Sequence, residues 1–287
     1  MQRQKRVAAI HDISCFGRCS LTVALPILSA AGIETPVIPT AVLSTHTGGF
    51  EGYTYRDLTQ DVMPVVRHWR GLGLEFDGIY TGFLGSLEQV DIVSECFDLL
   101  RGKDTLVVVD PVMADNGKLY PIFPSDFPKA MRKLCAKADV IVPNLTEAAL
   151  LLDEPYHEGP HDKAGIDRML EALHRLGPAR VVITGVSFDG KRLGAVVSDA
   201  RTGERAFASE LRIDPMYHGT GDVFASALTA ALLHGCPLAR AGEIAVKFTV
   251  DSIARTKEAG TDNRFGVNFE EGLGGLRAMI QGVPGGA

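Results

Sequence analysis

The strongest constraint on the fold is the alternation of short, continuous apolar runs with longer segments of helical periodicity. Six apolar runs predict β-strands, at residues 7–10, 35–41, 78–81, 106–110, 140–143 and 181–184. Strands that are apolar on both faces are typical of sheets that helices cover on both sides. Amphipathic segments lie between these runs, at 58–72, 86–100, 125–138 and 163–176. The order predicts an α/β fold with a mainly parallel central sheet and helices on both faces.

The pattern changes after residue 184. Residues 193–199 and 205–210 alternate around a turn at 201–204, which predicts a small antiparallel hairpin. Helices are predicted at 221–233 and 238–259, and a last helix after Asn268, a residue type that often caps helices. We find no linker or internal repeat, so residues 1–287 are expected to form a single domain, with a frayed end at 282–287.

Composition excludes several classes of protein. Of the 287 residues, 46% are hydrophobic and 22% are charged, which argues against a disordered chain. The formal charge of −6 lacks the basic footprint of a nucleic-acid-binding protein. We find no apolar stretch long enough for a membrane span or a signal peptide. The five scattered cysteines do not resemble a disulfide framework, so a cytoplasmic location is expected.

Polar or glycine-rich segments follow five of the predicted strands. In open α/β sheets, ligands bind beyond the carboxyl ends of the strands, so these segments are expected to meet at one site. The segments are residues 11–20, 43–49, 80–83, 110–115 and 143–147.

The sharpest motif is His-Gly-Thr-Gly-Asp-Val-Phe at 218–224, which runs into a predicted helix. Gly219 and Gly221 would let the backbone approach a ligand, and the helix N-terminus would offer N–H groups to an anion. Asp222 lies inside this cradle. The alternative is an ordinary helix start with Asp222 in the first turn. Because a carboxylate repels an anion unless it serves to take a proton, the motif favours catalysis, and an aspartate of ordinary pKa would be ionised at pH 7.

Two glycine motifs and one cysteine pattern are rejected. Residues 185–191 fit most of a P-loop, but Arg192 replaces the Mg²⁺-binding hydroxyl and a strand follows, so Asp189-Gly190 is predicted to form a turn. Phe224 replaces the third glycine of a dinucleotide fingerprint. His11, Cys15 and Cys19 have zinc-like spacing, but their segment is predicted to be a loop, which favours structural cysteines.

Three carboxylates are candidates for a magnesium site. Asp110, Asp115 and Glu147 could hold Mg²⁺ through oxygens and waters. The alternative is that Asp110 caps a turn before Pro111 and Glu147 lies in the first turn of a helix.

From residue 7 to about residue 259, the chain resembles the pyridoxal kinases of the ribokinase-like superfamily. The resemblance rests on six motifs: Ser14-Cys-Phe-Gly, Ser44-Thr-His-Thr-Gly48, Tyr80-Thr-Gly82, Asp110-Pro-Val-Met113, Pro143-Asn-Leu-Thr-Glu147 and Gly219-Thr-Gly-Asp222. It implies a ribokinase-like fold and the ATP-dependent phosphorylation of the 5′-hydroxymethyl group of a B6 vitamer (pyridoxal, pyridoxamine or pyridoxine), in B6 salvage.

The resemblance also implies a role for each matching position. Asp222 would be the general base, and an anion hole would be formed by Gly219, Thr220 and Gly221. The substrate would be bound by Ser14, His46, Thr47 and Tyr80. Mg²⁺ would be held by Asp110 and Glu147, and ATP would be bound by these residues with Asn144, Asp115, Tyr120 and Thr184, while residues 213–216 would border the adenine. A monovalent cation and a homodimer are further expectations, with small molecules as the only other partners.

The departures from the family pattern leave alternatives open. Thr45 stands where an Asn is frequent, and Phe83 stands where an aromatic hydroxyl can occur, so the preferred vitamer is open. The closest alternative is hydroxymethylpyrimidine/phosphomethylpyrimidine kinase of thiamine synthesis, a family that typically reads Gly-Thr-Gly-Cys where this chain has Asp222. The third alternative is a protein that binds pyridoxal phosphate without catalysis, and the intact Asp222 argues against it.

Overall fold

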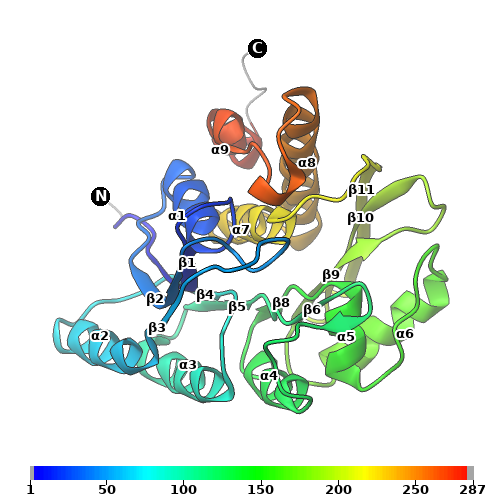
Figure 1. Ribbon diagram of the computed structural model, residues 1–287. Coiled ribbons are helices and arrows are strands. Elements are labelled where there is room, and N and C mark those ends of the chain that lie inside the picture. The colour runs from blue at the N-terminus through cyan, green and yellow to red at the C-terminus, as the bar shows by residue number, and fades with distance from the viewer. Residues whose placement is uncertain (1–2, 283–287) are drawn as a thin grey trace.

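A nine-stranded sheet, seen in a computed structural model that describes residues 3–282, runs through the centre of the protein (Figure 1). Its strand order is β11-β10-β9-β8-β5-β4-β1-β2-β3. The six central strands run parallel, and each corresponds to a predicted strand. They are β1 (Val7–Ser14), β2 (Val37–Leu43), β4 (Gly78–Thr81), β5 (Leu106–Val109), β8 (Val140–Ile141) and β9 (Arg180–Val186).

Antiparallel strands close both edges of the sheet. The predicted hairpin is confirmed as β10 (Arg192–Asp199) and β11 (Glu204–Leu211). The opposite edge, β3 (Tyr55–Asp57), was not predicted, because its three residues are all exposed and show no apolar pattern.

A two-stranded hairpin outside the main sheet was also not predicted. It consists of β6 (Ala114–Asp115) and β7 (Lys118–Leu119). Asn116 and Gly117 join the two strands with φ angles of 50° and 75°, the left-handed conformations that favour Asn-Gly in tight hairpins.

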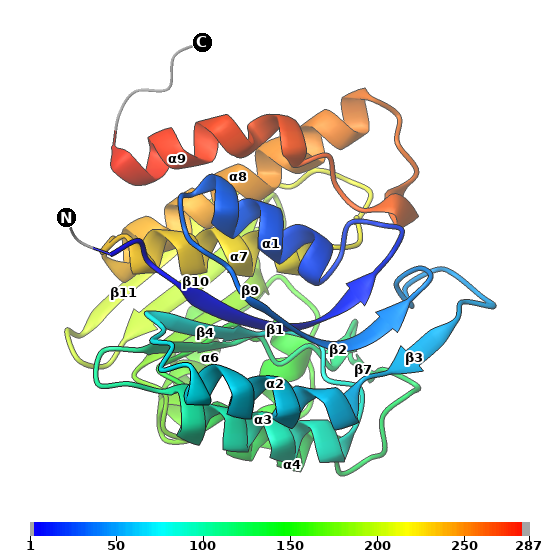
Figure 2. The same cartoon turned by 90° about the vertical axis from the view of Figure 1, so that its left-hand side faces the viewer.

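Helices cover both faces of the sheet, as predicted (Figures 1 and 2). One layer holds α1 (Leu21–Ala30), α7 (Thr220–Leu233), α8 (Leu238–Glu258) and α9 (Leu273–Gln281). The other layer holds α2 (Thr59–Gly71), α3 (Leu87–Leu100), α4 (Phe127–Cys135), α5 (Leu145–Leu152) and α6 (Lys163–His174). Two short 3₁₀ segments, η1 (Asn263–Phe265) and η2 (Glu270–Gly272), precede α9.

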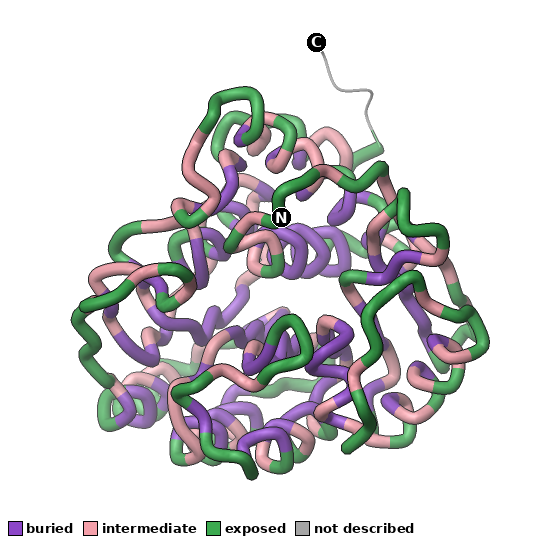
Figure 3. Tube along the Cα trace, turned by 45° about the vertical axis from the view of Figure 1, so that its right-hand side comes forward, coloured by how far each residue is buried: buried purple, intermediate pink, exposed green. Residues whose placement is uncertain are grey.

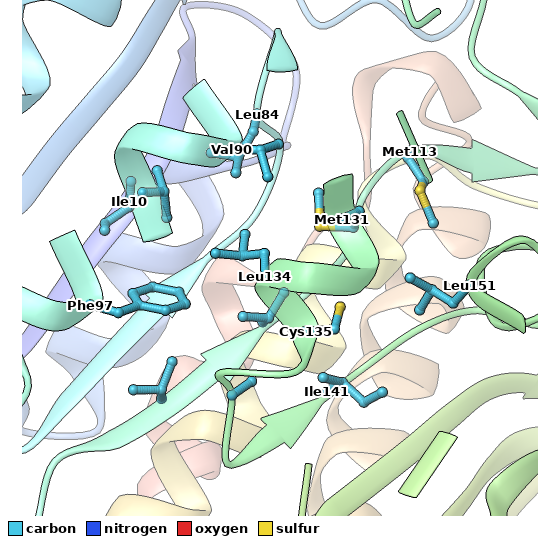
Figure 4. Close-up of a cluster of buried hydrophobic side chains, with 14 of the residues drawn as sticks. Ile10, Leu84, Val90, Phe97, Met113, Met131, Leu134, Cys135, Ile141 and Leu151 are labelled. Carbon is cyan, nitrogen blue, oxygen red and sulfur yellow. The ribbon is translucent and has the colours of Figure 1, made fainter. Parts of the chain in front are cut away.

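Each helical layer forms its own apolar core against the sheet. Neighbouring strand residues point to opposite faces, so Ile79 joins the α2–α6 core while Tyr80 joins the α1–α7–α8–α9 core. Figure 4 shows part of the first core, with Ile10, Phe97 and Ile141 close to α3 and α4. The central strands and α7 are buried over most of their length (Figure 3), which explains the continuous apolar runs.

Three sequence-based expectations about helices need correction. Helices α1 and α5 were not predicted, because Pro26 interrupts the first and six of the eight residues of the second are buried, which leaves no polar stripe. Asn268 does not cap the last helix: α9 begins after η2 with Gly272 at the N-cap, and the Asn268 amide donates to the Thr261 hydroxyl at 3.2 Å. The expected fraying lies, from residue 283 on, outside the described residues.

The path of the chain creates a switch point beside β1. After β1 the chain moves to β2 and β3 on one side, then crosses back to β4 on the other side and continues outward to β5, β8 and β9. Connections therefore diverge beyond the carboxyl ends of β1 and β4, which is the usual ligand position in open α/β sheets.

A buried glutamine ties four elements together next to this switch point. The Gln89 side-chain amide donates to the Thr40 carbonyl and the Thr59 hydroxyl, both at 2.9 Å, and to Asp57 at 3.2 Å. Its carbonyl accepts from the Gly85 N–H at 2.7 Å. The side chain is 1% exposed, so no water replaces these bonds if they are lost.

We therefore expect Gln89→Leu to lower the free energy of unfolding by about 1–3 kcal/mol for each buried group left unpaired. Urea unfolding measures the change. Glu95→Leu is the matched control, because Glu95 lies on the same helix with its side chain exposed. Equal unfolding midpoints for the two variants would contradict the proposed role of this network.

Candidate functional site

The predicted segments do meet at the carboxyl edge of the sheet. β1 ends at Ser14, β4 at Thr81 and β5 at Val109, and the N-termini of α5 and α7 lie at the same edge. The charge of Asp222 on α7 contributes to the raised pKa of Asp110 after β5, which places these two distant segments side by side.

The two glycines of the anion cradle differ in what they permit. Gly219 is the N-cap of α7 with φ 73°, and a Cβ there would collide with the carbonyl oxygen of Arg18. Gly221 has no heavy atom within 4 Å of a Cβ position, so open space lies beside the first turn of α7. Gly219 thus docks the helix on the β1–α1 loop, and Gly221 leaves room for a ligand. Thr220 lies between them, and its hydroxyl donates to the Tyr217 carbonyl at 3.3 Å.

Asp222 lies in the first turn of α7 and is half-buried. Removal from water raises its pKa to about 7, and the charge of Asp12 adds to this, while a hydrogen bond with the Ser20 backbone opposes it. The ordinary pKa expected from the sequence is therefore wrong, because the surrounding protein desolvates this carboxyl group. A carboxylate with a pKa near neutrality is suited to act as a general base.

Asp110 and Glu147 form a buried pair of carboxylates. Burial raises the pKa of Glu147 to about 8, although backbone N–H groups of Asn144, Met113 and Ala114 partly offset the shift. Burial also raises the pKa of Asp110, and the charges of Glu147 and Asp222 raise it further. Two adjacent buried carboxylates with no cationic partner among the described ion pairs match the oxygen donors that a hard cation prefers.

The position of Glu147 is fixed by a capping box at the start of α5. Asn144 accepts from the Glu147 N–H at 2.9 Å, and Glu147 accepts from the Asn144 N–H at 2.9 Å. The other Glu147 oxygen accepts from the Met113 N–H at 3.0 Å. The helix-start alternative is therefore correct for the local structure, and the same contacts aim the carboxylate toward Asp110.

The β6–β7 hairpin is attached to the same helix start. The Asn144 amide donates to the Ala114 carbonyl at 2.8 Å, and the Gly117 N–H donates to the Thr146 hydroxyl at 2.9 Å. Asp115 is exposed on this hairpin, and its carboxylate accepts from Asn116. Tyr120 follows β7 and is half-buried. Burial raises the pKa of its hydroxyl, which is raised further by the negative charges of Asp110, Asp115, Glu147 and Asp222.

The residues expected to bind a substrate ring differ in accessibility. Thr47 is exposed in the loop after β2, whereas Ser14 is fully buried and donates its hydroxyl to Asp12 at 3.2 Å. His46 accepts from the Gly48 N–H at 3.1 Å through Nδ1, so Nε2 carries the proton and donates to the Arg264 carbonyl at 2.6 Å. Both ring nitrogens of His46 thus hold loops together, and only the ring edge is left for a ligand.

Two further predicted residues lie at different depths. Tyr80 is completely buried beneath α7, with its hydroxyl 3.5 Å from that of Ser226, and the charges of Asp110 and Asp222 add to the effect of burial in raising its pKa. The sequence could not show this, because alternate residues of a parallel strand point to opposite cores. Thr184 is half-buried near the end of β9, where its backbone pairs with that of Asn144 in an isolated bridge.

Sequence reasoning missed two residues that touch the site. Asp12 and Ser20 flank the β1–α1 loop, and both influence the pKa of Asp222. The signal for Asp12 was present in the sequence, since His11-Asp12 is a polar pair inside an otherwise apolar strand. Nothing in the local sequence indicates that Ser20 reaches Asp222.

Two of the rejected motifs lie in non-helical segments. Cys15 and Cys19 lie in the non-helical segment between β1 and α1. Asp189 accepts from the Lys191 and Arg192 N–H groups, both at 2.8 Å, which confirms a turn in the P-loop-like segment. Within residues 3–282 no group of three or more His, Cys, Asp or Glu side chains is arranged to hold a metal.

Two cavities lie away from this edge. They have volumes of about 320 and 410 Å³ and are lined by segments near the starts of β5, β8 and β9 or by α6 and the β10–β11 turn. Neither contains a predicted site residue. None of the described helices is both long and apolar enough to cross a membrane.

A family model described as phosphomethylpyrimidine kinase matches residues 30–266 of the chain. The chain is 29% identical to the pyridoxine/pyridoxal/pyridoxamine kinase of Bordetella avium, over 88% of this chain and 86% of the relative. It is 27% identical to the hydroxymethylpyrimidine/phosphomethylpyrimidine kinase of Rhizobium meliloti, over 78% of this chain and 81% of the relative.

Solved structures resemble the chain over almost its whole length. A Bacteroides thetaiotaomicron protein named as a phosphomethylpyrimidine kinase, in a crystal form with pyridoxal, is 39% identical, with a TM-score of 0.91 and 96% of each chain covered. Pyridoxal kinase from Lactobacillus plantarum is 33% identical, with a TM-score of 0.88 and coverage of 98% of this chain and 99% of that one. Pyridoxal kinase from Leishmania donovani, in complex with ADP and pyridoxamine, is 25% identical, with a TM-score of 0.86 and 96% of each chain covered.

The sheet order, the placement of helices on both faces and these matches agree with the expected ribokinase-like fold. The chain therefore belongs to the phosphomethylpyrimidine kinase family, among the ribokinase-like kinases that include the pyridoxal kinases it resembles.

Proposed function

We propose that residues 1–287 form a single catalytic domain that transfers the γ-phosphoryl group of ATP to the 5′-hydroxymethyl group of a B6 vitamer. The observation that carries the proposal is the position of Asp222. It lies in the first turn of α7, beside the open space at Gly221 and near the buried Asp110–Glu147 pair. Two comparisons support this proposal. The chain is similar in sequence to a B6 vitamer kinase, and one structurally similar protein binds ADP and pyridoxamine.

In the proposed reaction, Asp222 accepts the proton of the substrate hydroxyl while that oxygen bonds to the γ-phosphorus. The bond between the γ-phosphorus and the bridging oxygen of ADP breaks, so ADP leaves with the electron pair. The N–H groups at the start of α7 point at the charge that develops on the transferring group. A pKa near 7 keeps Asp222 a strong enough base to share the proton in the transition state.

Mg²⁺ fits the paired carboxylates of Asp110 and Glu147, and when bound it would neutralise phosphate charge. These two side chains alone cannot complete its coordination shell, so phosphate oxygens and waters would supply the rest. Asn144 holds Glu147 in place, and Asp115 and Tyr120 on and after the β6–β7 hairpin would cover the phosphates. Thr184 would face the nucleotide, with residues 213–216 beside the adenine.

The ring would lie against the loops after β1 and β2, near Ser14, His46 and Thr47. Thr47 alone of these three is exposed with its hydroxyl available, since Ser14 and His46 are engaged within the protein. The preferred vitamer, a monovalent cation, a homodimer and a cytoplasmic location stay predictions from the resemblance and the composition.

Phosphorylation of hydroxymethylpyrimidine is the second candidate function, favoured by the matching family model and the Rhizobium relative. Asp222 in place of the cysteine typical of that family favours the B6 vitamers. A binding protein without catalysis is the least favoured, because Asp222 lies beside the open space at Gly221, where a carboxylate would repel a bound phosphate unless it takes a proton.

A coupled assay of ADP release tests the proposal with pyridoxal, pyridoxamine, pyridoxine and hydroxymethylpyrimidine as separate substrates. We expect Mg²⁺-dependent turnover with at least one B6 vitamer. Turnover with hydroxymethylpyrimidine alone would establish the second candidate. Tight vitamer binding without any ADP release would establish the third.

The two cradle glycines give a matched pair of variants. Gly221→Ala should raise the KM for ATP about tenfold or more, because a Cβ would occupy the open space beside the helix N-terminus. Its melting temperature should not fall, since alanine is favourable in a helix by up to about 1 kcal/mol. Gly219→Ala should instead lower the melting temperature, because it combines a left-handed φ with a collision at Arg18. Unchanged kinetics in Gly221→Ala would show that the ATP phosphates do not bind beside Gly221.

The variant Asp222→Asn separates catalysis from capping. Loss of the general base should reduce kcat by about 10²–10⁴, or roughly 3–5 kcal/mol of activation free energy. Near-normal kcat in the folded variant would show that Asp222 does not accept the proton of the substrate hydroxyl.

The same variant should be more stable than the wild type at pH 8. Because the folded pKa of Asp222 is raised to about 7 from 3.8, the folded state binds the extra proton between these values. Stability is therefore lost as pH rises through that window, and Asn has no such titration. Melting temperatures at pH 5 and pH 8 measure the difference, which should be larger at pH 8. An equal difference at both pH values would contradict the raised pKa.

A further inference from the structure

A second carboxylate, Asp12, is buried beside Asp222 and has no role in the reaction described above. It lies in the last part of β1 and is 3% exposed. Its Oδ2 accepts from the Ser14 hydroxyl at 3.2 Å. Its Oδ1 is buried without a hydrogen-bond partner among the residues that the structure describes, although a buried carboxylate oxygen is costly to leave unpaired.

Ser20 connects Asp12 to Asp222. The Ser20 side chain partly offsets the raised pKa of Asp12, and the Ser20 backbone partly offsets the raised pKa of Asp222, so Ser20 lies next to both acids. The two acids are also close to each other, because the charge of Asp12 contributes to the raised pKa of Asp222.

The backbone of Ser20 has an uncommon conformation at this position. It has φ 55° and ψ −129° at the N-cap of α1, and its hydroxyl does not cap that helix. A non-glycine residue in this conformation is uncommon, and such strain concentrates at functional sites.

The protein supplies no positive charge to balance Asp12. His11, the neighbouring residue, is neutral because burial lowers its pKa to about 3. Cys19 and Tyr55, whose pKa values the Asp12 charge helps to raise, stay uncharged as well. None of the ion pairs within residues 3–282 includes Asp12. A proton-donating group of a ligand would supply the partner that Oδ1 lacks among the described residues.

A B6 vitamer carries such a partner. Its ring nitrogen is meta to the carbon that bears the reacting hydroxymethyl group, so a ring whose hydroxymethyl faces Asp222 presents the nitrogen within the same small site. In 3-hydroxypyridines this nitrogen is readily protonated, and a carboxylate is the usual protein partner of a pyridinium nitrogen.

We propose that Asp12 is a specificity-determining residue that binds the ring nitrogen of the substrate through Oδ1, with one proton shared between them. The inference rests on the proposed function, since it takes Asp222 to face the hydroxymethyl group. Ser14 holds the other oxygen of the Asp12 carboxylate, so it is a positioning residue that acts on the substrate through Asp12.

The variant Asp12→Asn tests this proposal because it keeps the shape and removes the charge. It should raise both KM and the dissociation constant for pyridoxine about 10–100-fold, while the KM for ATP changes less than about twofold and kcat stays within a few-fold. Asp61→Asn, an exposed acid on α2, is the control and should change none of these values.

Two ligand probes distinguish a nitrogen contact from a general effect on the site. The pyridoxine analogue with C–H in place of the ring nitrogen should bind the wild type and Asp12→Asn equally weakly. The absorption spectrum of bound pyridoxine should show the protonated ring in the wild type and lose that form in the variant. Melting temperatures of both proteins confirm that the variant is folded.

Unchanged pyridoxine affinity in Asp12→Asn would overturn the inference, as would an equal loss of affinity for the carbon analogue. A loss of kcat with unchanged affinity would also overturn it. That result would indicate that Asp12 acts instead by raising the pKa of Asp222. The proposed function fails separately, if the wild type binds pyridoxine but releases no ADP with any vitamer. In that case the dissociation constants and spectra still decide the role of Asp12.

Discussion

The burial of α7 is the constraint on which the site depends. Every residue from Val223 to Leu233 is buried, between the sheet and helices α1 and α8. A helix that is apolar all round can occupy only the interior, so its axis and its N-terminus are fixed by packing. The first turn, with Gly221 and Asp222, is the part of α7 that emerges at the carboxyl edge. Packing far from the carboxyl edge thus sets the position of Asp222 and of the two cradle glycines.

The second constraint is electrostatic. Asp12, Asp110, Glu147 and Asp222 gather at one edge of the sheet, and burial raises the pKa of each of them. In the chain alone these charges oppose folding, because no described Lys or Arg is paired with them. A cation at Asp110 and Glu147, a proton at Asp222 and a ring nitrogen at Asp12 would each relieve one part of this cost. The arrangement is typical of a site whose stability is lower so that its ligands bind more tightly.

The local contacts show how an ordinary helix start positions side chains at the carboxyl edge. Glu147 is held by a capping box that any helix could use, yet the same bonds aim it at Asp110. Asn144 caps α5 and also anchors the β6–β7 hairpin through the Ala114 carbonyl. The structural role of Glu147 and its proposed functional role are therefore compatible. One set of hydrogen bonds both starts the helix and positions the carboxylate.

The sequence by itself determined the six parallel strands, the β10–β11 hairpin and the edge of the sheet where the site lies, because apolar periodicity follows directly from burial on two faces. It also singled out Asp222, since glycines before a helix leave a local signature. It did not reveal α1, α5 or β3, whose residues lack a clean pattern of apolar and polar faces. Only the tertiary structure decided that Tyr80 is completely buried beneath α7 and that Asp12 lies near Asp222, because depth and contacts between distant segments depend on how the layers pack.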